Sequence, residues 1–223
     1  SSGVFSVSQT LSVSTHPIQI AGGDWDSDND TDLAVLLRDN TLVQIWLNGG
    51  TGTFSKQTTT YTVGSLPMGM ISGDWNCDGK QDLAVSNSGD NTLSLIYGKG
   101  TGEFDTPVTI SSGRGPGALA AADFDNDSKM DFVVGHHFLV STNGVSLLTG
   151  DFSLTLSDTS SSTGYSSATS FAATTVKDGS APAAIVISDV DNDSKLDILI
   201  TLPVSKKLAV LSGKLYSGNL SCP

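Results

Sequence analysis

The sequence predicts an all-β fold assembled from four repeated sheets. Short runs of β-branched and apolar residues are bounded by Gly, Asn and Asp, as β-strands are. No stretch shows the 3.6-residue apolar period of an amphipathic helix. Four such runs recur in each unit of about 50 residues, which is typical of the four-stranded blades of a β-propeller. The repeats are compatible with a closed four-bladed ring and with part of a larger propeller.

Each repeat is marked by an acidic segment that follows a proline. The acidic segments begin at Asp24, Asp74, Asp123 and Asp189, and the prolines that precede each of them by seven residues are Pro17, Pro67, Pro116 and Pro182. We expect one propeller domain over residues 1–223, with blades at 17–62, 67–111, 116–157 and 182–215.

Within a repeat, the strand-like runs come in a fixed order. In the first repeat an apolar run at 18–21 precedes the acidic segment, and runs at 33–37 and 41–47 follow it. A Gly-x-Phe motif that ends at Phe54 then opens an alternating, Thr-rich fourth run. In the third repeat the third run is predicted at 145–148.

The two ends of the chain suggest how a ring of blades would close. The Gly-x-Phe motif also occurs at Gly3-Val-Phe5, although no blade precedes it, and the last blade has no fourth run of its own. We expect residues 3–13 to form a strand that completes the last blade and leaves no sheet edge exposed.

One connection departs from the repeat. The segment 157–180 is rich in Ser and Thr and lengthens the third repeat. A surface loop is the favoured interpretation. The alternative is a binding loop in which Tyr165 and Phe171 supply the apolar contacts.

Composition excludes several classes of protein. The formal charge is −12, with 11 Lys and Arg against 23 Asp and Glu, so the chain should repel nucleic acid. No apolar run approaches the roughly 20 residues of a transmembrane helix. No serine-hydrolase elbow, zinc-protease motif or phosphate-binding loop is present, and we expect a protein that is not an enzyme.

The acidic segments carry carboxylates at alternate positions of a tight turn. Like charges this close repel one another, and a bound divalent cation removes the repulsion. Oxygen ligands in a flexible loop favour a hard cation, Ca²⁺ ahead of Mg²⁺. Positions 1, 3, 5 and 9 offer side-chain oxygens and position 7 a backbone carbonyl, as in EF-hand loops, although strands flank these loops. The sequence therefore predicts about four Ca²⁺ sites.

The predicted ligands account for most of the acidity, since 15 of the 23 acidic residues supply a side-chain oxygen. The side-chain ligands are Asp24, Asp26, Asp28 and Asp32; Asp74, Asn76, Asp78 and Asp82; Asp123, Asp125, Asp127 and Asp131; and Asp189, Asp191, Asp193 and Asp197. The carbonyl ligands are Asp30, Lys80, Lys129 and Lys195. Position 6 favours a positive φ, which suits Gly79, is tolerated by Asn29 and suits Ser128 and Ser194 less well.

This combination of proline, Asp-x-[Asp/Asn]-x-Asp-x₃-Asp and Gly-x-Phe resembles the FG-GAP/VCBS repeat. That family builds the β-propeller of integrin α-subunits and of many secreted or surface proteins. The resemblance implies Ca²⁺ binding by the acidic loops, which would lie between the first and second strands of each blade. It also implies that third strands end on the face carrying these loops, which places Cys222 within reach of Cys77. A Cys77–Cys222 disulfide and two unrelated thiols are the two alternatives.

The resemblance gives a broad expectation about function. We expect a secreted or cell-surface module that is stabilised by calcium and binds or adheres to a glycan or an extracellular protein. A homo-oligomer of the chain is one expected assembly. The alternatives are an enzyme or accessory domain of a secreted polysaccharide-active enzyme, and a structural spacer of a surface protein. Aromatic residues at position 2 of the loops, such as Trp25 and Trp75, favour packing between blades over sugar binding. His136 and His137 are predicted to lie on the surface.

Overall fold

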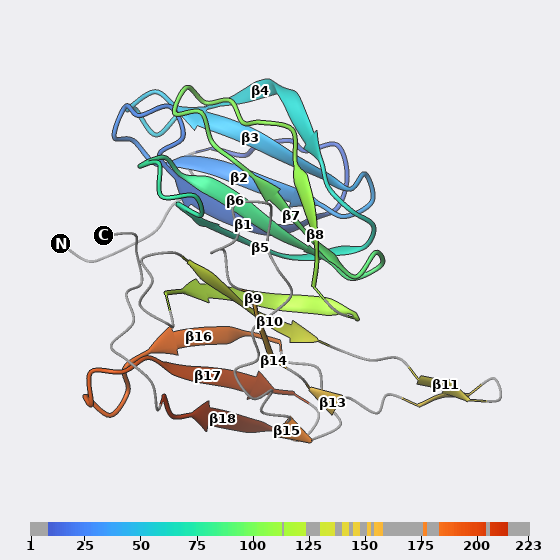
Figure 1. Ribbon diagram of the computed structural model, residues 1–223. Helices are drawn as coiled ribbons and strands as arrows, with labels where there is room; N and C mark the ends of the chain where they lie inside the picture. Colours follow the sequence, from blue (N-terminus) through green and yellow to red (C-terminus); the bar gives the residue numbers. More distant parts are fainter. Residues whose placement is uncertain are drawn as a thin grey trace, which may run out of the picture.

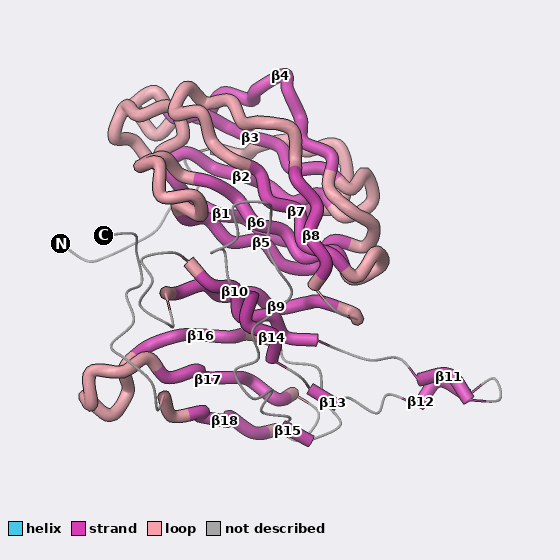
Figure 2. Tube along the Cα trace, in the orientation of Figure 1, coloured by secondary structure: helices cyan, strands magenta, loops and turns pink. Residues whose placement is uncertain are grey.

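The computed structural model describes residues 9–112, 114–123, 130–136, 183–203 and 206–213, and the backbone of five short strands between residues 140 and 177. All secondary structure in these residues is β-strand (Figure 2). Every paired strand is antiparallel. The all-β prediction is therefore confirmed. Among the same residues, no helical segment has the length and hydropathy needed to cross a membrane.

The first two repeats each form a complete four-stranded sheet (Figure 1). The first sheet consists, in spatial order, of β1 (Pro17–Gly23), β2 (Asp32–Leu37), β3 (Leu42–Asn48) and β4 (Phe54–Thr62). The second consists of β5 (Pro67–Gly73), β6 (Asp82–Asn87), β7 (Thr92–Ile96) and β8 (Val108–Ser111). Strands in sequence order are neighbours in space, as tight connections of antiparallel strands require.

In the described part of the chain, the third and fourth sheets each have three strands. The third is ordered β14 (Leu154–Ser157), β10 (Asp131–His136) and β9 (Pro116–Ala122). The fourth is ordered β16 (Ile185–Ser188), β17 (Asp197–Leu202) and β18 (Lys207–Leu211). Apart from the third run of the third repeat, these strands fall in the predicted runs, while the closure of a ring and a fourth strand of the last sheet are not shown by these residues.

The third repeat differs from the prediction in its third run. β12 (Val145–Leu147) does not join the sheet but pairs with β11 (Val140–Thr142) in a separate hairpin. β14 occupies the place beside β10 instead, and β13 (Asp151–Phe152) pairs with β15 (Val176–Lys177). Both 145–147 and 154–157 alternate apolar and polar residues, so the pattern alone could not choose which run pairs with β10. Tyr165 and Phe171 lie outside the described residues.

The sheets stack through their first strands. β1 lies beside β5, β5 beside β9, and β9 beside β16, so the inner strands follow one another around an axis as in a propeller. Apolar clusters fill each space between successive sheets. Among the described residues, no extended contact joins the fourth sheet back to the first.

The Gly-x-Phe motif of the second repeat packs against the first sheet and is hydrogen-bonded to it. The ring of Phe104 lies 5.9 Å from that of Trp25 and 5.2 Å from that of Tyr61, both in the first repeat. The Phe104 N–H donates to the Tyr61 hydroxyl over 2.9 Å, and the Gly102 N–H donates to the Trp25 carbonyl over 2.7 Å. Trp25 and Trp75 are almost fully buried, so the packing interpretation of the loop aromatics is confirmed.

Two predictions made for surface or terminal residues need comment. His136 is buried, and its Nδ1 lies 3.0 Å from the Arg114 carbonyl, so the surface prediction was wrong for this residue; His137 lies outside the described residues. Residues 9–13 form no strand, and their side chains Leu11 and Val13 pack on the first sheet. Residues 3–8 are not described, so completion of the last blade by this segment stays a prediction.

Candidate metal centre

The acidic segments are the turns between the first and second strands of the sheets. They connect β1 to β2, β5 to β6 and β16 to β17, as the resemblance implied. In each turn the backbone is left-handed at positions 4 and 6. The φ values are 64° and 69° at Ser27 and Asn29, 57° and 81° at Cys77 and Gly79, and 61° and 67° at Asn192 and Ser194. The sequence predicted the positive φ at position 6 but not the one at position 4.

The carboxylate at position 1 accepts hydrogen bonds from the backbone of its own turn. Asp24 accepts hydrogen bonds from the N–H groups of Asp28 and Asn29, over 3.2 and 3.0 Å. Asp74 accepts from Asp78 and Gly79, and Asp189 from Asp193 and Ser194, at 2.8–3.2 Å. These bonds curl the backbone around the side chain, which is the behaviour of Asp at the start of a turn.

The carboxylate at position 9 has a second role that the sequence did not reveal. Asp32 is fully buried and accepts from the N–H of Trp25 over 2.9 Å and from that of Asn48 over 2.8 Å. It therefore ties the start of its own loop to the end of β3. The same double acceptance is made by Asp82, from Trp75 and Gly98, and by Asp197, from Val190 and Gly213. The sequence did not reveal this role because it depends on the burial of the carboxylate. The spacing of the acidic residues identifies position 9 only as a metal ligand.

Two of the loops bring carboxylates close enough to share a cation. Oxygens of Asp24, Asp26 and Asp28 lie within 4.8 Å of one another, and so do oxygens of Asp189, Asp191 and Asp197. One Asp26 oxygen is buried and has no hydrogen-bond partner. An all-carboxylate set with an orphaned oxygen fits a hard divalent cation such as Ca²⁺.

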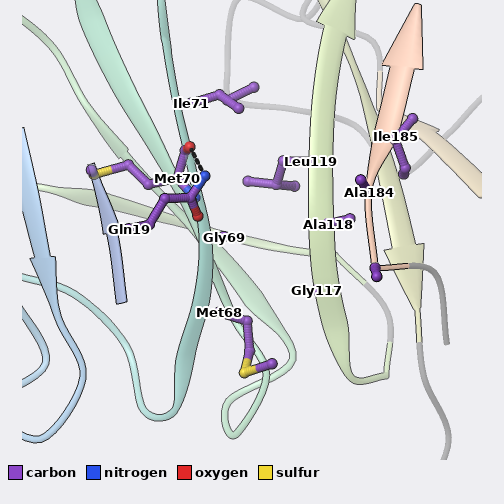
Figure 3. Close-up of a pocket in the computed structure, with 11 residues that line it drawn as sticks. Gln19, Met68, Gly69, Met70, Ile71, Gly117, Ala118, Leu119, Ala184 and Ile185 are labelled. Atoms are coloured by element: carbon purple, nitrogen blue, oxygen red, sulfur yellow. Dashed lines mark hydrogen bonds between the residues drawn. The ribbon is translucent and has the colours of Figure 1, made fainter. Parts of the chain in front are cut away.

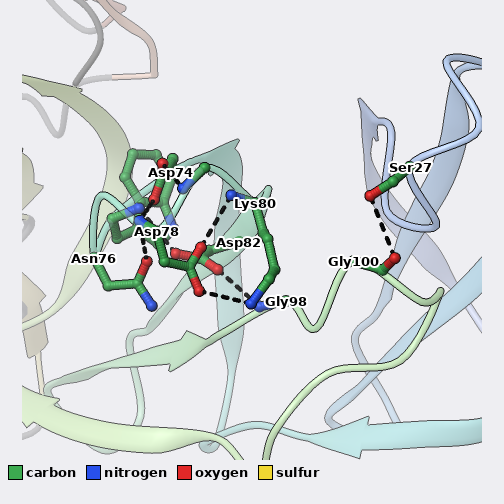
Figure 4. A network of polar contacts seen from close by, with 10 residues as sticks. Ser27, Asp74, Asn76, Asp78, Lys80, Asp82, Gly98 and Gly100 are labelled. Atoms are coloured by element: carbon green, nitrogen blue, oxygen red, sulfur yellow. Dashed lines mark hydrogen bonds and ion pairs between the residues drawn. The ribbon is translucent and has the colours of Figure 1, made fainter. Parts of the chain in front are cut away.

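The second loop is not one of these clusters. It carries Asn76 where the others have a carboxylate, and the Asn76 side-chain oxygen accepts from the Asp78 N–H over 3.1 Å. Its position-7 residue, Lys80, donates to Asp78 through its backbone N–H over 2.9 Å and through Nζ over 3.2 Å (Figure 4). Lys195 does the same to Asp193 in the fourth repeat, with Nζ at 2.8 Å. The first loop has Asp30 at this position, so no lysine offsets its charge there.

The pKa values follow these surroundings. Burial raises the pKa of Asp82 to about 6, although the N–H groups of Gly98 and Trp75 oppose the rise. Burial, followed by the charges of Asp32 and Asp28, raises the pKa of Asp26. Burial would raise the pKa of Asp78 as well, but its bonds to Lys80 hold it below the ordinary value.

The ion pair in the fourth loop acts on both partners. The Lys195 side chain lowers the pKa of the Asp193 carboxyl, and Asp193 raises the pKa of the Lys195 amine. Lys80 and Lys195 therefore neutralise part of the charge of their own loops, whereas the first loop has Asp30 at this position and no such lysine.

The remaining predicted ligands are only partly described. Asp123 and Asp131 of the third loop are buried, while Asp125, Asp127 and Lys129 lie outside the described residues. Cys77 is disulfide-bonded. Cys222 lies outside the described residues, so its pairing with Cys77 stays a prediction.

A cavity of about 560 Å³ lies between the inner strands β5, β9 and β16 (Figure 3). Its wall is made mainly of apolar and small residues, among them Met68, Met70 and Leu119. The Gln19 amide on its wall is already bound, because it donates to the Met70 carbonyl and accepts from the Met70 N–H, both over 2.8 Å. The cavity thus offers an apolar groove along the axis of the stack.

Comparison with known proteins agrees with this geometry. The model of the FG-GAP-like repeat matches residues 24–85 and again residues 74–134. Residues 24–134 are FG-GAP-like repeats. Each match runs from one acidic loop into the strand that follows the next, which are the elements described above. No curated protein matches the chain.

Two of the matching solved structures share the fold at low sequence identity. BBS1N, from its complex with ARL6DN, is 11% identical at a TM-score of 0.50, and the match covers 91% of this chain and 58% of that one. The Tc holotoxin pore of Photorhabdus luminescens is 16% identical at a TM-score of 0.51, over 92% of this chain and 9% of that one. The V. cholerae biofilm matrix protein Bap1 matches at 13% identity and a TM-score of 0.42, and the match covers 91% of this chain and 38% of that one. This chain therefore spans less than two thirds of each of these proteins.

Proposed function

We propose that the chain is a calcium-stabilised, extracellular binding module of the β-propeller type. The observation that carries the proposal is the convergence of carboxylates in equivalent loops, with an unpartnered Asp26 oxygen in the first of them. Ca²⁺ would be held by Asp24, Asp26 and Asp28 in one loop and by Asp189, Asp191 and Asp197 in another. The bound ion would cancel the repulsion within each loop and hold two strands of a sheet together.

A stabilised loop would also support the contact between sheets. Trp25, at position 2 of the first loop, packs on Phe104 of the second sheet, and the Ser27 hydroxyl donates to the Gly100 carbonyl over 3.3 Å. Ca²⁺ bound beside these residues would therefore strengthen the joint between sheets as well as the hairpin. A secreted or surface location is supported by the disulfide at Cys77, since disulfides persist in oxidising compartments.

The surface favours a protein ligand over a glycan. Sugar rings stack on exposed aromatic faces, and the large exposed apolar side chains among the described residues are all aliphatic or Met. The three tryptophans are buried between or against the sheets. Aliphatic patches suit a protein partner better than a polar sugar.

Calcium binding is tested by calorimetric titration of the metal-stripped protein with Ca²⁺, followed by thermal melting. We expect Ca²⁺ to raise the melting temperature, because a free concentration of 100 times Kd stabilises by about 2.7 kcal/mol per site. The Asp26→Asn and Asp191→Asn variants should each lose one binding event. The matched control is Asp105→Asn, which removes an exposed acid outside the loops. Retention of every binding event in both loop variants would contradict the ligand assignment.

Ligand binding is tested on arrays of glycans and of secreted and cell-surface protein domains, in Ca²⁺ and in chelator. We expect calcium-dependent binding to a protein domain. Binding to a defined sugar instead would replace the protein ligand by a glycan. Absence of binding on both arrays by the intact, calcium-loaded protein would contradict a binding module.

A further inference from the structure

Two side chains bond to main-chain groups where the inner strands of the first two sheets meet. The Gln19 carboxamide donates to the Met70 carbonyl and accepts from the Met70 N–H, both over 2.8 Å (Figure 3). The Ser72 hydroxyl donates to the Gly22 carbonyl over 2.9 Å. Main-chain groups at the inner edges of β1 and β5 are thereby supplied with partners, as polar groups shielded from water require.

These two side chains occupy positions that the repeat defines. Gln19 comes two residues after Pro17, and Ser72 comes five residues after Pro67. At the two joints between later sheets, the same positions hold side chains that neither donate nor accept a hydrogen bond. They are Gly69 and Ala118 in place of Gln19, and Ala121 and Ile187 in place of Ser72.

The inner edges of β9 and β16 carry the same main-chain groups as the inner edge of β5. The three strands pair with the next strand in one register, in which Met70, Leu119 and Ile185 lie opposite Val85, Val134 and Ile200. Because main-chain groups alternate in direction along an antiparallel strand, the N–H and C=O of Leu119 and Ile185 point to the axis as those of Met70 do. Among the described residues, no side chain or loop bonds to these groups of Leu119 or Ile185.

These inner edges line a groove along the axis of the stack. The cavity of about 560 Å³ described above and a second cavity of about 550 Å³ share the wall residues Ile71, Leu119 and Ile185. The second cavity extends to Asp74, at the start of an acidic loop. Inner strands face the axis in a propeller of any number of blades, so further sheets would extend the ring around this groove and leave the edges facing it.

We propose that this groove binds an extended peptide segment of a protein partner, whose amide groups pair with the inner edges of β9 and β16. The proposal rests on the proposed function, because it names the part of a protein ligand that the module would hold. The Gln19 carboxamide is chemically similar to a peptide group, and a peptide would bond to Leu119 or Ile185 as Gln19 bonds to Met70. Addition of a strand to an exposed sheet edge is a recurring mode of peptide recognition.

The groove also suits a peptide better than a sugar. On β9 the residues Leu119 and Ala121 are two apart, which is the spacing at which successive main-chain groups of one strand edge point the same way. The wall between the bonding groups is apolar, with Met68 on one side and Ile187 on the other. Sugar hydroxyls would lose hydration against such a wall without gaining partners, whereas apolar side chains of a peptide would not.

Amide hydrogen exchange, followed by NMR on the full chain in Ca²⁺, tests the free edges first. The Met70 N–H is held by Gln19, so it should exchange on the order of tenfold more slowly than the N–H groups of Leu119 and Ile185. Exchange at Leu119 and Ile185 that is as slow as at Met70 would show that these edges are already occupied, which would overturn the proposal.

The binding probe is a library of short random peptides displayed on phage and selected on the calcium-loaded chain. Selected peptides should slow exchange at Leu119 and Ile185 on the order of tenfold or more. Ala118→Gln places a carboxamide beside Ile185, where it should compete with the peptide and weaken binding on the order of tenfold. The matched control is Val108→Gln, which adds the same side chain at a 47% exposed position on the outer strand β8 and should leave binding unchanged.

A second variant keeps the test valid if Ala118→Gln fails to fold. Gln19→Ala frees the inner edge of β5, so exchange of the Met70 N–H should become faster and peptides should then protect it. Unchanged exchange at Met70 in this variant, or selected peptides that leave Leu119 and Ile185 unprotected, would overturn the proposal.

The outcomes separate the groove from the proposed function. A protein domain that binds the chain equally well with Ala118→Gln, and leaves exchange at Leu119 and Ile185 unchanged, would keep the binding module and overturn the groove. Failure to select any peptide would overturn the groove as well. Protection of these N–H groups by N-acetylated sugars and not by peptides would replace the peptide with a glycan and contradict the proposal.

Discussion

The Asp24 loop and the Asp74 loop share a backbone path but balance their charges differently. Both have left-handed residues at positions 4 and 6 and a buried position-9 carboxylate that accepts two N–H groups. The Asp74 loop contains Lys80, which bonds to Asp78, and a disulfide at Cys77. The Asp24 loop has Asp30 in place of the lysine, and its Trp25 packs on Phe104 of the second repeat. The Ser27 hydroxyl of the same loop donates to the Gly100 carbonyl (Figure 4).

This difference indicates that one fold motif serves two purposes. The same backbone N–H groups bond to the position-1 carboxylate in both loops, so both loops have the same shape. The loops differ in charge: Lys80 offsets part of the charge of the Asp74 loop, while the Asp24 loop has no lysine at that position and, under the proposed function, binds a cation from solution. The Asp24 loop should therefore respond more strongly to Ca²⁺, and its response should reach the neighbouring sheet through Trp25.

The largest effect is expected from Phe104→Ala. This change removes the ring that contacts Trp25 and Tyr61, and it should lower the free energy of unfolding by about 3–5 kcal/mol. It should also weaken Ca²⁺ binding to the Asp24 loop and leave the Asp74 loop unaffected. Denaturant unfolding and calcium titration measure the two effects. The control is Phe54→Ala, at the corresponding position of the first repeat, where the ring packs beside Leu11 and Val13 and, among the described residues, contacts no loop aromatic. Losses of equal size in the two variants would contradict the account.

Removing the position-9 carboxylate should destabilise both loops alike. Asp32→Asn and Asp82→Asn each leave one buried N–H group without an acceptor, so we expect a loss of about 2–3 kcal/mol in chelator for each variant. Chemical denaturation measures the loss, and Asp105→Asn should show none. If only one of the two variants were destabilised, the shared role of this carboxylate would be wrong.

The metal-free protein should gain stability on mild acidification. Asp82 has a pKa of about 6 in the folded protein against 3.8 for the free side chain, so the folded state binds the proton more tightly. Its stabilising contribution is therefore present below pH 3.8 and lost as the pH rises through about 6. Melting in chelator should occur at higher temperature at pH 5 than at pH 7, and Asp82→Asn should reduce this gain. In saturating Ca²⁺ the trend should reverse, because acid releases the metal; the same trend in both conditions would count against a cation in the loops.

Exchanging the position-7 residues should produce the smallest effect. Asp30→Lys gives the Asp24 loop an internal cation, and Lys80→Asp removes it from the Asp74 loop. Since these side chains are exposed, each change should alter metal-free stability by less than about 1 kcal/mol, upward for Asp30→Lys and downward for Lys80→Asp. The calcium-induced rise in melting temperature should become smaller in Asp30→Lys and larger in Lys80→Asp. If this rise stayed unchanged in both variants, the position-7 residue would not set the calcium dependence.

The repeat units, the loop positions and the packing of Trp25 could all be predicted from the sequence, because each depends on local pattern and spacing. The third repeat could not, since 145–147 and 154–157 carry equivalent patterns and tertiary pairing selects between them. The burial of His136 and the double hydrogen bond of Asp32 also escaped prediction. Each depends on at least one partner 16 or more residues away, Asn48 for Asp32 and Arg114 for His136, which a motif does not specify.

A crystal structure grown with Ca²⁺ and measured for anomalous scattering tests the central claim most directly. The account predicts one calcium peak bounded by Asp24, Asp26 and Asp28, and another bounded by Asp189, Asp191 and Asp197. Lys195 Nζ should have left Asp193 to make room for the second ion. Ordered loops with the Lys195–Asp193 pair intact and no calcium peak in either loop would contradict it.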